Sequence, residues 1–235
     1  MPTPLVVSDV KKSFIMHLRG GLVLPVVTDV NFSVASGECA VLSGPSGVGK
    51  SSILKMLYGN YAVDNGQILV SHEGRTLDMA TASPRTILDI RKKTMGYVSQ
   101  FLRTVPRVSA LDVVAEPLTA RGMGQEEARE RAGEMLSMLN LPKALWQLPP
   151  STFSGGEQQR VNIARGFITD HRILLVDEPT ASLDAMNRGV VEELIAAKKR
   201  DGVAIIGIFH DLDVREKVAD RLIDVSAFSP RKKAA

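Results

Sequence analysis

The stretch Gly44-Pro-Ser-Gly-Val-Gly-Lys-Ser-Ser52 decides the fold of this chain. It matches the pattern G-x-x-x-x-G-K-[ST], in which Gly44, Gly49, Lys50 and Ser51 occupy the fixed positions. A short apolar run, 39–42, precedes the stretch, and apolar residues at helical spacing follow it. Strand, tight loop and helix is the context in which this pattern binds nucleotide phosphates, so the sequence predicts a P-loop within an α/β fold.

The residue types in this loop suit the chemistry of a phosphate chain. A loop with little side-chain bulk lets several backbone N–H groups point into one concavity, and the following helix adds the positive end of its dipole. We expect Lys50 to contact the β- and γ-phosphates and the Ser51 hydroxyl to bind Mg²⁺. The nucleotide-binding residues expected here are Gly44, Pro45, Ser46, Gly47, Val48, Gly49, Lys50, Ser51 and Ser52.

The composition is that of an ordinary globular protein with 235 residues, 44% hydrophobic and 23% charged, which suits a single domain, 1–235. A net charge of +3 gives no argument for nucleic-acid binding, and we expect the basic tail 231–233 to be a solvated end. Cys39 is the only cysteine, which excludes an intramolecular disulfide and a cysteine-based metal site. No apolar run approaches the ~18 residues of a membrane span, and the N-terminus lacks the features of a signal peptide. We therefore expect a cytoplasmic protein whose membrane role, if any, comes through a partner.

The first forty residues read as antiparallel β structure beside the nucleotide core. Strands are expected at 5–10 and 26–34, with an extended segment at 13–17 and a turn at 35–38. Phe14 lies on this structure and fits two roles. Its ring offers a flat face to an adenine, or it packs in the core, and the residues alone favour core packing.

The middle of the chain changes from mixed structure to helices. A turn at 64–66 leads into a strand at 67–70, a helix follows at 83–92, and a short apolar strand at 95–99 ends in Gln100. From 109 to about 146 the apolar spacing is helical. We predict that 101–152 is a helical subdomain inserted into the α/β core.

A second helix start with a small hydroxyl residue and two glycines occurs at Ser154-Gly155-Gly156. It reads either as an ordinary helix cap or as a second anion-binding helix end. The presence of two phosphate-type helix starts in one chain favours the anion-binding interpretation.

Polar side chains follow three apolar strands at the point where each strand ends. The run 172–176 leads into Asp177 and Glu178, the run 203–209 leads into His210, and Gln100 ends the strand 95–99. Asp177 has the chemistry to hold Mg²⁺, and Glu178 that to act on an attacking water as a general base. Because ligands bind at the carboxyl ends of the strands in an open α/β sheet, we expect these four side chains to converge on the γ-phosphate.

Together these motifs resemble those of the ATP-binding cassette (ABC) ATPases over nearly the whole chain. Residues 44–51 look like the Walker A loop, 173–178 like Walker B, and 153–157 like the family signature. Gln100 resembles the Q-loop residue, Asp184 lies in a segment like the D-loop, and His210 resembles the switch histidine. Phe153 and Glu157 depart from the usual Leu and Gln of the signature, but its Ser-Gly-Gly core is intact.

The resemblance implies an Mg²⁺-dependent ATPase that converts ATP and water to ADP and phosphate. It implies a metal site formed by Ser51, Gln100 and Asp177, and adenine stacking by Phe14. Glu178 and His210 would be catalytic. In the family two cassettes pack head to tail, so the signature of one closes over the ATP of the other. The residues that would act in trans are Ser154, Gly155, Gly156, Glu157 and Asp184.

Three phrases resemble more closely the ATPase subunit of the bacterial carbon–phosphorus lyase system. They are 96–103, 153–166 and 207–211. This resemblance implies an accessory ATPase of phosphonate catabolism, where phosphonate is coupled to an ATP-derived ribose triphosphate. Its expected partners are soluble lyase core subunits and a second cassette, which is either a copy of itself or a sister ATPase. A direct role in cleaving the carbon–phosphorus bond is not expected, because one cysteine cannot ligate an iron–sulfur cluster.

Two alternatives stay open. The same ATPase residues would serve the nucleotide-binding subunit of a membrane transporter of the lipoprotein-release or phosphonate type. A cassette that binds ATP as a structural clamp with little turnover is the other alternative, against which Glu178 and His210 argue together.

Overall fold

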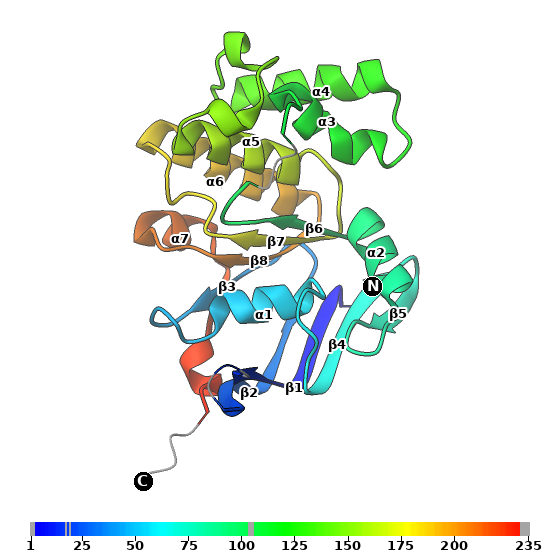
Figure 1. Cartoon of the computed structure of the whole chain (residues 1–235), viewed down its shortest axis with the longest axis vertical. Coiled ribbons are helices and arrows are strands. Elements are labelled where there is room, and N and C mark those ends of the chain that lie inside the picture. Colours follow the sequence, from blue (N-terminus) through cyan, green and yellow to red (C-terminus); the bar gives the residue numbers. More distant parts are fainter. Residues whose placement is uncertain (1–2, 17, 19, 103–105, 231–235) are drawn as a thin grey trace.

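The computed structural model describes residues 3–16, 18, 20–102 and 106–230 (Figure 1). Its centre is a parallel sheet, and the strands of this sheet lie in the following order: β6 (Met95–Val98), β7 (Ile173–Asp177), β8 (Ala204–Ile208), β3 (Cys39–Ser43) and β9 (Arg221–Asp224). Every residue of β7 and β8 is buried, which explains why these strands read as continuous apolar runs.

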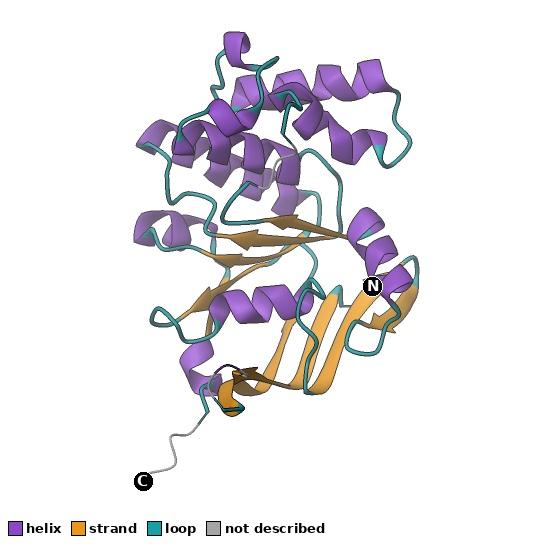
Figure 2. Cartoon of the chain, viewed as in Figure 1, coloured by secondary structure: helices purple, strands orange, loops and turns teal. Residues whose placement is uncertain are grey.

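A separate antiparallel sheet faces the parallel one (Figure 2). Its strands lie in the order β2 (Leu22–Val34), β1 (Leu5–Met16), β4 (Asn65–His72) and β5 (Arg75–Asp78). The strand and the extended segment expected near the N-terminus form the single long strand β1 as far as Met16. His17, which was expected to continue this segment, lies outside the described residues.

The predicted turn at 64–66 is wrong in part, because Asn65 and Gly66 already belong to β4. Here β4 runs antiparallel beside β1, and a Cβ atom on Gly66 would lie 2.5 Å from the backbone of Asp9. Gly66 has φ 93° and the ladder between β1 and β4 shifts register at this point, so the glycine serves a bulge and a close approach of two backbones.

Helices cover both faces of the parallel sheet (Figures 1 and 2). Helix α1 (Lys50–Leu57) lies between the two sheets, and α5 (Gly155–Phe167) and α6 (Ala185–Arg200) cover the opposite face. Beyond α5 lie α3 (Ala110–Thr119) and α4 (Gln125–Met138). The described residues also form α2 (Pro84–Lys93), α7 (Leu212–Val218) and the short 3₁₀ turns η2 (Lys143–Leu145), η3 (Pro150–Thr152) and η4 (Val225–Phe228).

Two hydrophobic cores result, one on each face of the parallel sheet. Along β3, Cys39 and Val41 point into the core shared with α3–α6, whereas Ala40 and Leu42 point into the core shared with α1 and the antiparallel sheet. This alternation follows from the two-residue period of a strand. Because the parallel sheet is fixed from both sides, the loops at its carboxyl ends are held on a rigid base.

Candidate nucleotide-binding site

The loop between β3 and α1 has the shape that its glycines predict. Gly44, Gly47 and Gly49 all have positive φ, at 125°, 80° and 110°. A Cβ atom on Gly49 would lie 2.9 Å from a methyl group of Val27, so a side chain at this position meets both a strained backbone and a steric clash. The loop therefore curls tightly onto the start of α1, whose N-terminal cap is Gly49.

The ammonium group of Lys50 lies inside this curl. Its Nζ donates hydrogen bonds to the carbonyl oxygens of Gly44 at 2.7 Å and Pro45 at 2.9 Å. The residue is only 9% exposed, which is rare for lysine and occurs where the charge has fixed partners. The loop thus holds a full positive charge through two of its own carbonyl groups.

Asp177 and Ser51 come together next to the loop. The hydroxyl oxygen Oγ of Ser51 lies 3.4 Å from Oδ1 of Asp177, although 126 residues separate them in the chain. Burial raises the pKa of Asp177, and a hydrogen bond from Tyr97 opposes that rise. A hydroxyl and a buried carboxylate side by side are oxygen donors of the kind that Mg²⁺ prefers, so the residues present fit a magnesium ion.

Glu178 is held between His210 and Gln100. Its Oε1 lies 2.7 Å from Nε2 of His210, and its Oε2 accepts a hydrogen bond of 3.0 Å from Nε2 of Gln100. The three residues follow β7, β8 and β6, which are neighbours in the sheet. The structure thus joins three of the four side chains expected at the strand ends, while Asp177 bonds Ser51 and Tyr97 instead, and the convergence of all four on a γ-phosphate stays a prediction. The backbone of Glu178 has φ 52°, a strained conformation of the kind found at functional sites.

Phe14 lies on β1 and is partly buried. Its ring meets the ring of Tyr61 edge to face, with centroids 5.2 Å apart, and Nζ of Lys12 lies 5.3 Å from its centre. Phe14 is therefore neither a full core residue nor a free ring, and its stacking on an adenine stays a prediction.

The signature residues form a complete helix cap at the start of α5. The Ser154 hydroxyl accepts a hydrogen bond from the Glu157 backbone, and the Glu157 carboxylate accepts one of 2.8 Å from the Ser154 backbone. Bonds from Ser154 lower the pKa of Glu157. Helix α5 lies on the face of the parallel sheet opposite to α1, the helix that follows the P-loop (Figure 1). Both Ser154 and Gly155 are exposed.

Asp184 caps α6 and is linked to the helical part of the chain. Its Oδ1 accepts hydrogen bonds from the backbone N–H and the side-chain amide of Asn187, at 2.8 and 2.9 Å. The buried Asn187 in turn accepts a bond of 3.1 Å from the amide of Asn140, which follows α4. The sequence reasoning missed Asn187, because an asparagine inside a helix pattern carries no signal of the partners that it meets.

The sequence reasoning also missed Tyr97. This residue lies on β6 opposite Leu175 of β7, and its hydroxyl donates a 3.0 Å hydrogen bond to Oδ2 of Asp177. A tyrosine in the strand that ends at Gln100 was an available signal, but only the pairing of β6 with β7 places it beside the carboxylate.

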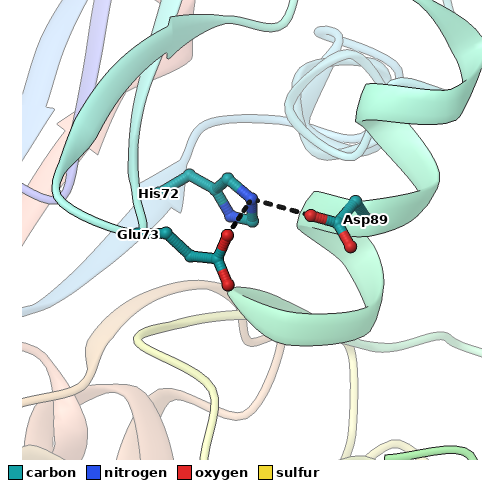
Figure 3. Close-up of side chains that lie close together, drawn as sticks. All are labelled: His72, Glu73 and Asp89. Atoms are coloured by element: carbon teal, nitrogen blue, oxygen red, sulfur yellow. Dashed lines mark hydrogen bonds and ion pairs between the residues drawn. The ribbon is translucent and has the colours of Figure 1, made fainter.

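A second cluster of ligand-type side chains lies between β4 and α2, where His72 faces Glu73 and Asp89 (Figure 3). Nε2 of His72 lies 3.0 Å from Asp89 and 3.7 Å from Glu73, and its Nδ1 lies 2.7 Å from the hydroxyl of Thr94. The ammonium of Lys93 lies 3.1 Å from both carboxylates. Lys93 thus pairs with both acidic groups, and the cluster links the antiparallel sheet to α2 through ion pairs and hydrogen bonds.

Comparisons with known proteins identify the family of the chain. The family model described as ABC transporter matches residues 27–181. The chain is 41% identical over 201 residues to the lipoprotein-releasing system ATP-binding protein LolD 2 of Caulobacter vibrioides, covering 85% of this chain and 86% of that protein. It is 36% identical to the Fe(3+) ions import ATP-binding protein FbpC 1 of Rhizobium meliloti, covering 84% of this chain but only about half, 53%, of that protein.

Solved structures show the same fold. The dimeric bacterial ABC transporter cassette MJ0796 superposes with a TM-score of 0.85 at 27% identity, covering 94% of this chain and 95% of that one. A post-hydrolysis form of MJ0796 bound to ADP and Pi superposes with a TM-score of 0.82. Within the described residues, no helix combines the length and the apolar composition that a membrane crossing needs. The predicted fold class is confirmed. The chain belongs to the ABC transporter family, in which it is an ATP-binding cassette with a P-loop NTPase fold.

Proposed function

We propose that this chain is an Mg²⁺-dependent ATPase subunit that works in the cytoplasm as half of a cassette dimer. The observation that carries the proposal is the arrangement of Glu178 between His210 and Gln100, beside the pair of Ser51 and Asp177. This arrangement supports the proposal, because a carboxylate with two side-chain partners lies beside residues whose chemistry suits Mg²⁺ and nucleotide phosphates.

Each side chain has a chemical role in this proposal. Lys50 neutralises charge on the β- and γ-phosphates, while Ser51 and Asp177 hold Mg²⁺, with Gln100 as a further ligand. When bound, the ion supplies electrostatic stabilisation of the charge that develops on the phosphates. Glu178 accepts a proton from the attacking water.

His210 supports the same step in two ways. It contacts the γ-phosphate, and its 2.7 Å contact with Oε1 holds the Glu178 carboxylate in place. Because Glu178 already has two side-chain partners, little reorganisation is needed before the reaction.

The dimer completes the site. Ser154, Gly155, Gly156 and Glu157 would offer the N-terminus of α5 to the γ-phosphate of the partner copy, and Asp184 would lie at the contact. Three observations support this: the cap at Ser154 is exposed, Met186 beside Asp184 is 70% exposed, and the related MJ0796 cassette is dimeric. Phe14 would stack on the adenine, beside Tyr61.

The biological role that we propose is that of an accessory subunit of the phosphonate carbon–phosphorus lyase machinery. The support is the phrase-level resemblance of 96–103, 153–166 and 207–211 to PhnL, the ATP-binding subunit of that system. The second cassette is then either another copy or a PhnK-like sister subunit. We propose that the helical subdomain 101–152 of this chain contacts the core lyase subunits.

A second candidate is the nucleotide-binding subunit of a transporter. The 41% identity to LolD 2 favours it, as does a cavity of about 780 Å³ beside Gln100. The cavity is lined by residues of α1, α2, β6, α3 and α5 and by Phe101, which is 74% exposed, and it is large enough to take a segment of a permease.

Capture of partners from cells separates the two candidates. The chain is tagged, the host is grown with a phosphonate as the sole phosphorus source, and co-purifying proteins are identified by mass spectrometry. Soluble lyase subunits together with a second cassette support the lyase role. A polytopic permease in their place contradicts the lyase role and supports the transporter candidate. An untagged strain is the control for non-specific capture.

A further inference from the structure

The carboxylate of Asp177 is held from two sides. Its Oδ1 lies 3.4 Å from the hydroxyl oxygen of Ser51, and its Oδ2 accepts a 3.0 Å hydrogen bond from the hydroxyl of Tyr97. Asp177 is only 3% exposed, so water contributes little to fixing this group. The two bonds together fix the orientation in which the carboxylate faces Ser51.

We propose that Tyr97 is a positioning residue that keeps Asp177 in the orientation needed to bind Mg²⁺. The inference rests on the proposed function, because it concerns the same metal site. Groups that bond the far side of a metal ligand orient it, and their loss weakens metal binding even though they never touch the ion. Tyr97 meets this description, because it bonds the carboxylate oxygen that faces away from Ser51.

Tyr97 is itself held in place by elements outside the P-loop. Its ring stacks on the ring of Tyr58, with centroids 4.9 Å apart and planes at 24°. The guanidinium of Arg91 lies 4.3 Å from the centre of the Tyr58 ring, and its Nε donates a 2.8 Å hydrogen bond to the Tyr58 carbonyl. Arg91 belongs to α2, so the position of the hydroxyl is set by the packing of α2 and the end of α1 against β6. The stack thus connects the metal site to a part of the molecule that carries none of the nucleotide motifs.

The proposal differs from a purely structural reading of the same bond. If the bond only gives the Tyr97 hydroxyl a hydrogen-bond acceptor, removing the hydroxyl changes the stability of the fold. It does not then change the dependence of nucleotide binding on Mg²⁺. If it positions Asp177, the Mg²⁺ dependence changes while binding of the metal-free nucleotide does not.

The test is Tyr97→Phe, which keeps the aromatic ring on Tyr58 and removes only the hydroxyl. Binding of a fluorescent, non-hydrolysable ATP analogue is measured with EDTA and then across a Mg²⁺ titration at fixed pH. We expect the dissociation constant in EDTA to stay within twofold of the parent value and the half-saturating Mg²⁺ concentration to rise about tenfold or more. A matched control is Tyr58→Phe, which removes a hydroxyl from the other ring of the stack and should leave both values unchanged.

A second variant and a second readout keep the test decisive. Tyr58→Leu removes the stacking partner but leaves the Tyr97 hydroxyl, and we expect a smaller rise in the half-saturating Mg²⁺ concentration. Counting bound Mn²⁺ by electron paramagnetic resonance reports the metal without relying on the nucleotide signal. A half-saturating Mg²⁺ concentration within twofold of the parent in Tyr97→Phe overturns the proposal. If the parent protein itself shows no Mg²⁺ enhancement of nucleotide binding, the proposed function fails instead, which separates the two outcomes.

Discussion

Nε2 of His210 lies 2.7 Å from Oε1 of Glu178, across the ends of two adjacent parallel strands. The backbone reinforces this pairing, because the N–H of Glu178 donates a 3.0 Å hydrogen bond to the carbonyl of Ile208. Strand pairing therefore fixes the backbones that carry this imidazole and this carboxylate, at the carboxyl ends of β7 and β8. The P-loop begins at the carboxyl end of β3, on the same side of the sheet, and the first two predictions concern the chemistry of this side.

The first prediction concerns Glu178→Gln. The amide keeps the size of the side chain but cannot accept the proton of the attacking water, so we expect turnover to fall roughly 10²–10⁴-fold. Affinity for ATP should stay near the parent value, since Lys50 and Ser51 are untouched. Phosphate release and equilibrium nucleotide binding measure the two quantities. Glu193→Gln, an exposed position on α6, is the matched control. Turnover near the parent value in Glu178→Gln would remove this residue from the role of base.

The second prediction concerns Lys50→Ala. The variant removes the positive charge that the carbonyls of Gly44 and Pro45 hold at the loop. A charge-assisted hydrogen bond from this ammonium to a phosphate oxygen of ATP would contribute roughly 1.5–3 kcal/mol to binding. We therefore expect affinity for ATP to fall about 10- to 100-fold by calorimetry. Lys143→Ala, at an exposed lysine of η2, should leave affinity unchanged. Equal affinity of Lys50→Ala and the parent would contradict the assignment of the loop.

The third prediction concerns acid stability and His171. Burial of the ring, and then the nearby positive charge of Arg121, lower the pKa of His171 to about 4, whereas an unfolded histidine has about 6.5. Between these two values the unfolded chain binds more protons than the folded one, so stability falls as the pH drops through this window. At pH 5 the loss relative to pH 7.5 is at most roughly 2 kcal/mol, and less to the extent that water reaches the ring.

Chemical denaturation at pH 7.5, 6 and 5 measures this effect. His171→Asn keeps a polar group near the Thr169 hydroxyl, which lies 2.6 Å from Nδ1 of the ring, but it does not titrate in this range. Its free energy of unfolding should therefore decline less between pH 7.5 and pH 5 than that of the parent. Identical declines in the two proteins would show that His171 does not carry the pH dependence.

The fourth prediction compares two glycines inside helices. A Cβ atom on Gly166 of α5 would lie 2.3 Å from Cγ2 of the buried Val98, whereas one on Gly189 of α6 would meet nothing within 4 Å. We expect Gly166→Ala to destabilise the fold by roughly 1–3 kcal/mol through overpacking. Gly189→Ala should stabilise it by roughly 0.5–1 kcal/mol, because alanine favours a helix. Thermal unfolding of both variants checks the opposite signs, and a stabilised Gly166→Ala would contradict the packing of α5 on β6.

Local patterns predicted the site well wherever the needed information lay in consecutive residues. The glycines and Lys50 of the loop, the buried run before Asp177, and the cap at Ser154 each lie in one short segment. Their residue types report backbone conformation and burial directly, so their structural context could be predicted. The weaker predictions concerned Gly66, which reads as a turn residue but lies in a strand because β1 passes against it.

The sequence by itself determined the family, the P-loop with its neighbouring strand and helix, and the polar residues that end three strands. It did so because strand period, loop glycines and helix caps are local properties of the chain. Only the tertiary structure decided which of these residues meet, as when Tyr97 of β6 bonds Asp177 of β7 and Asn140 reaches the cap at Asp184 through Asn187. These contacts depend on strand order and on the packing of helices over the sheet. Both are settled by the burial of apolar faces far apart in the sequence.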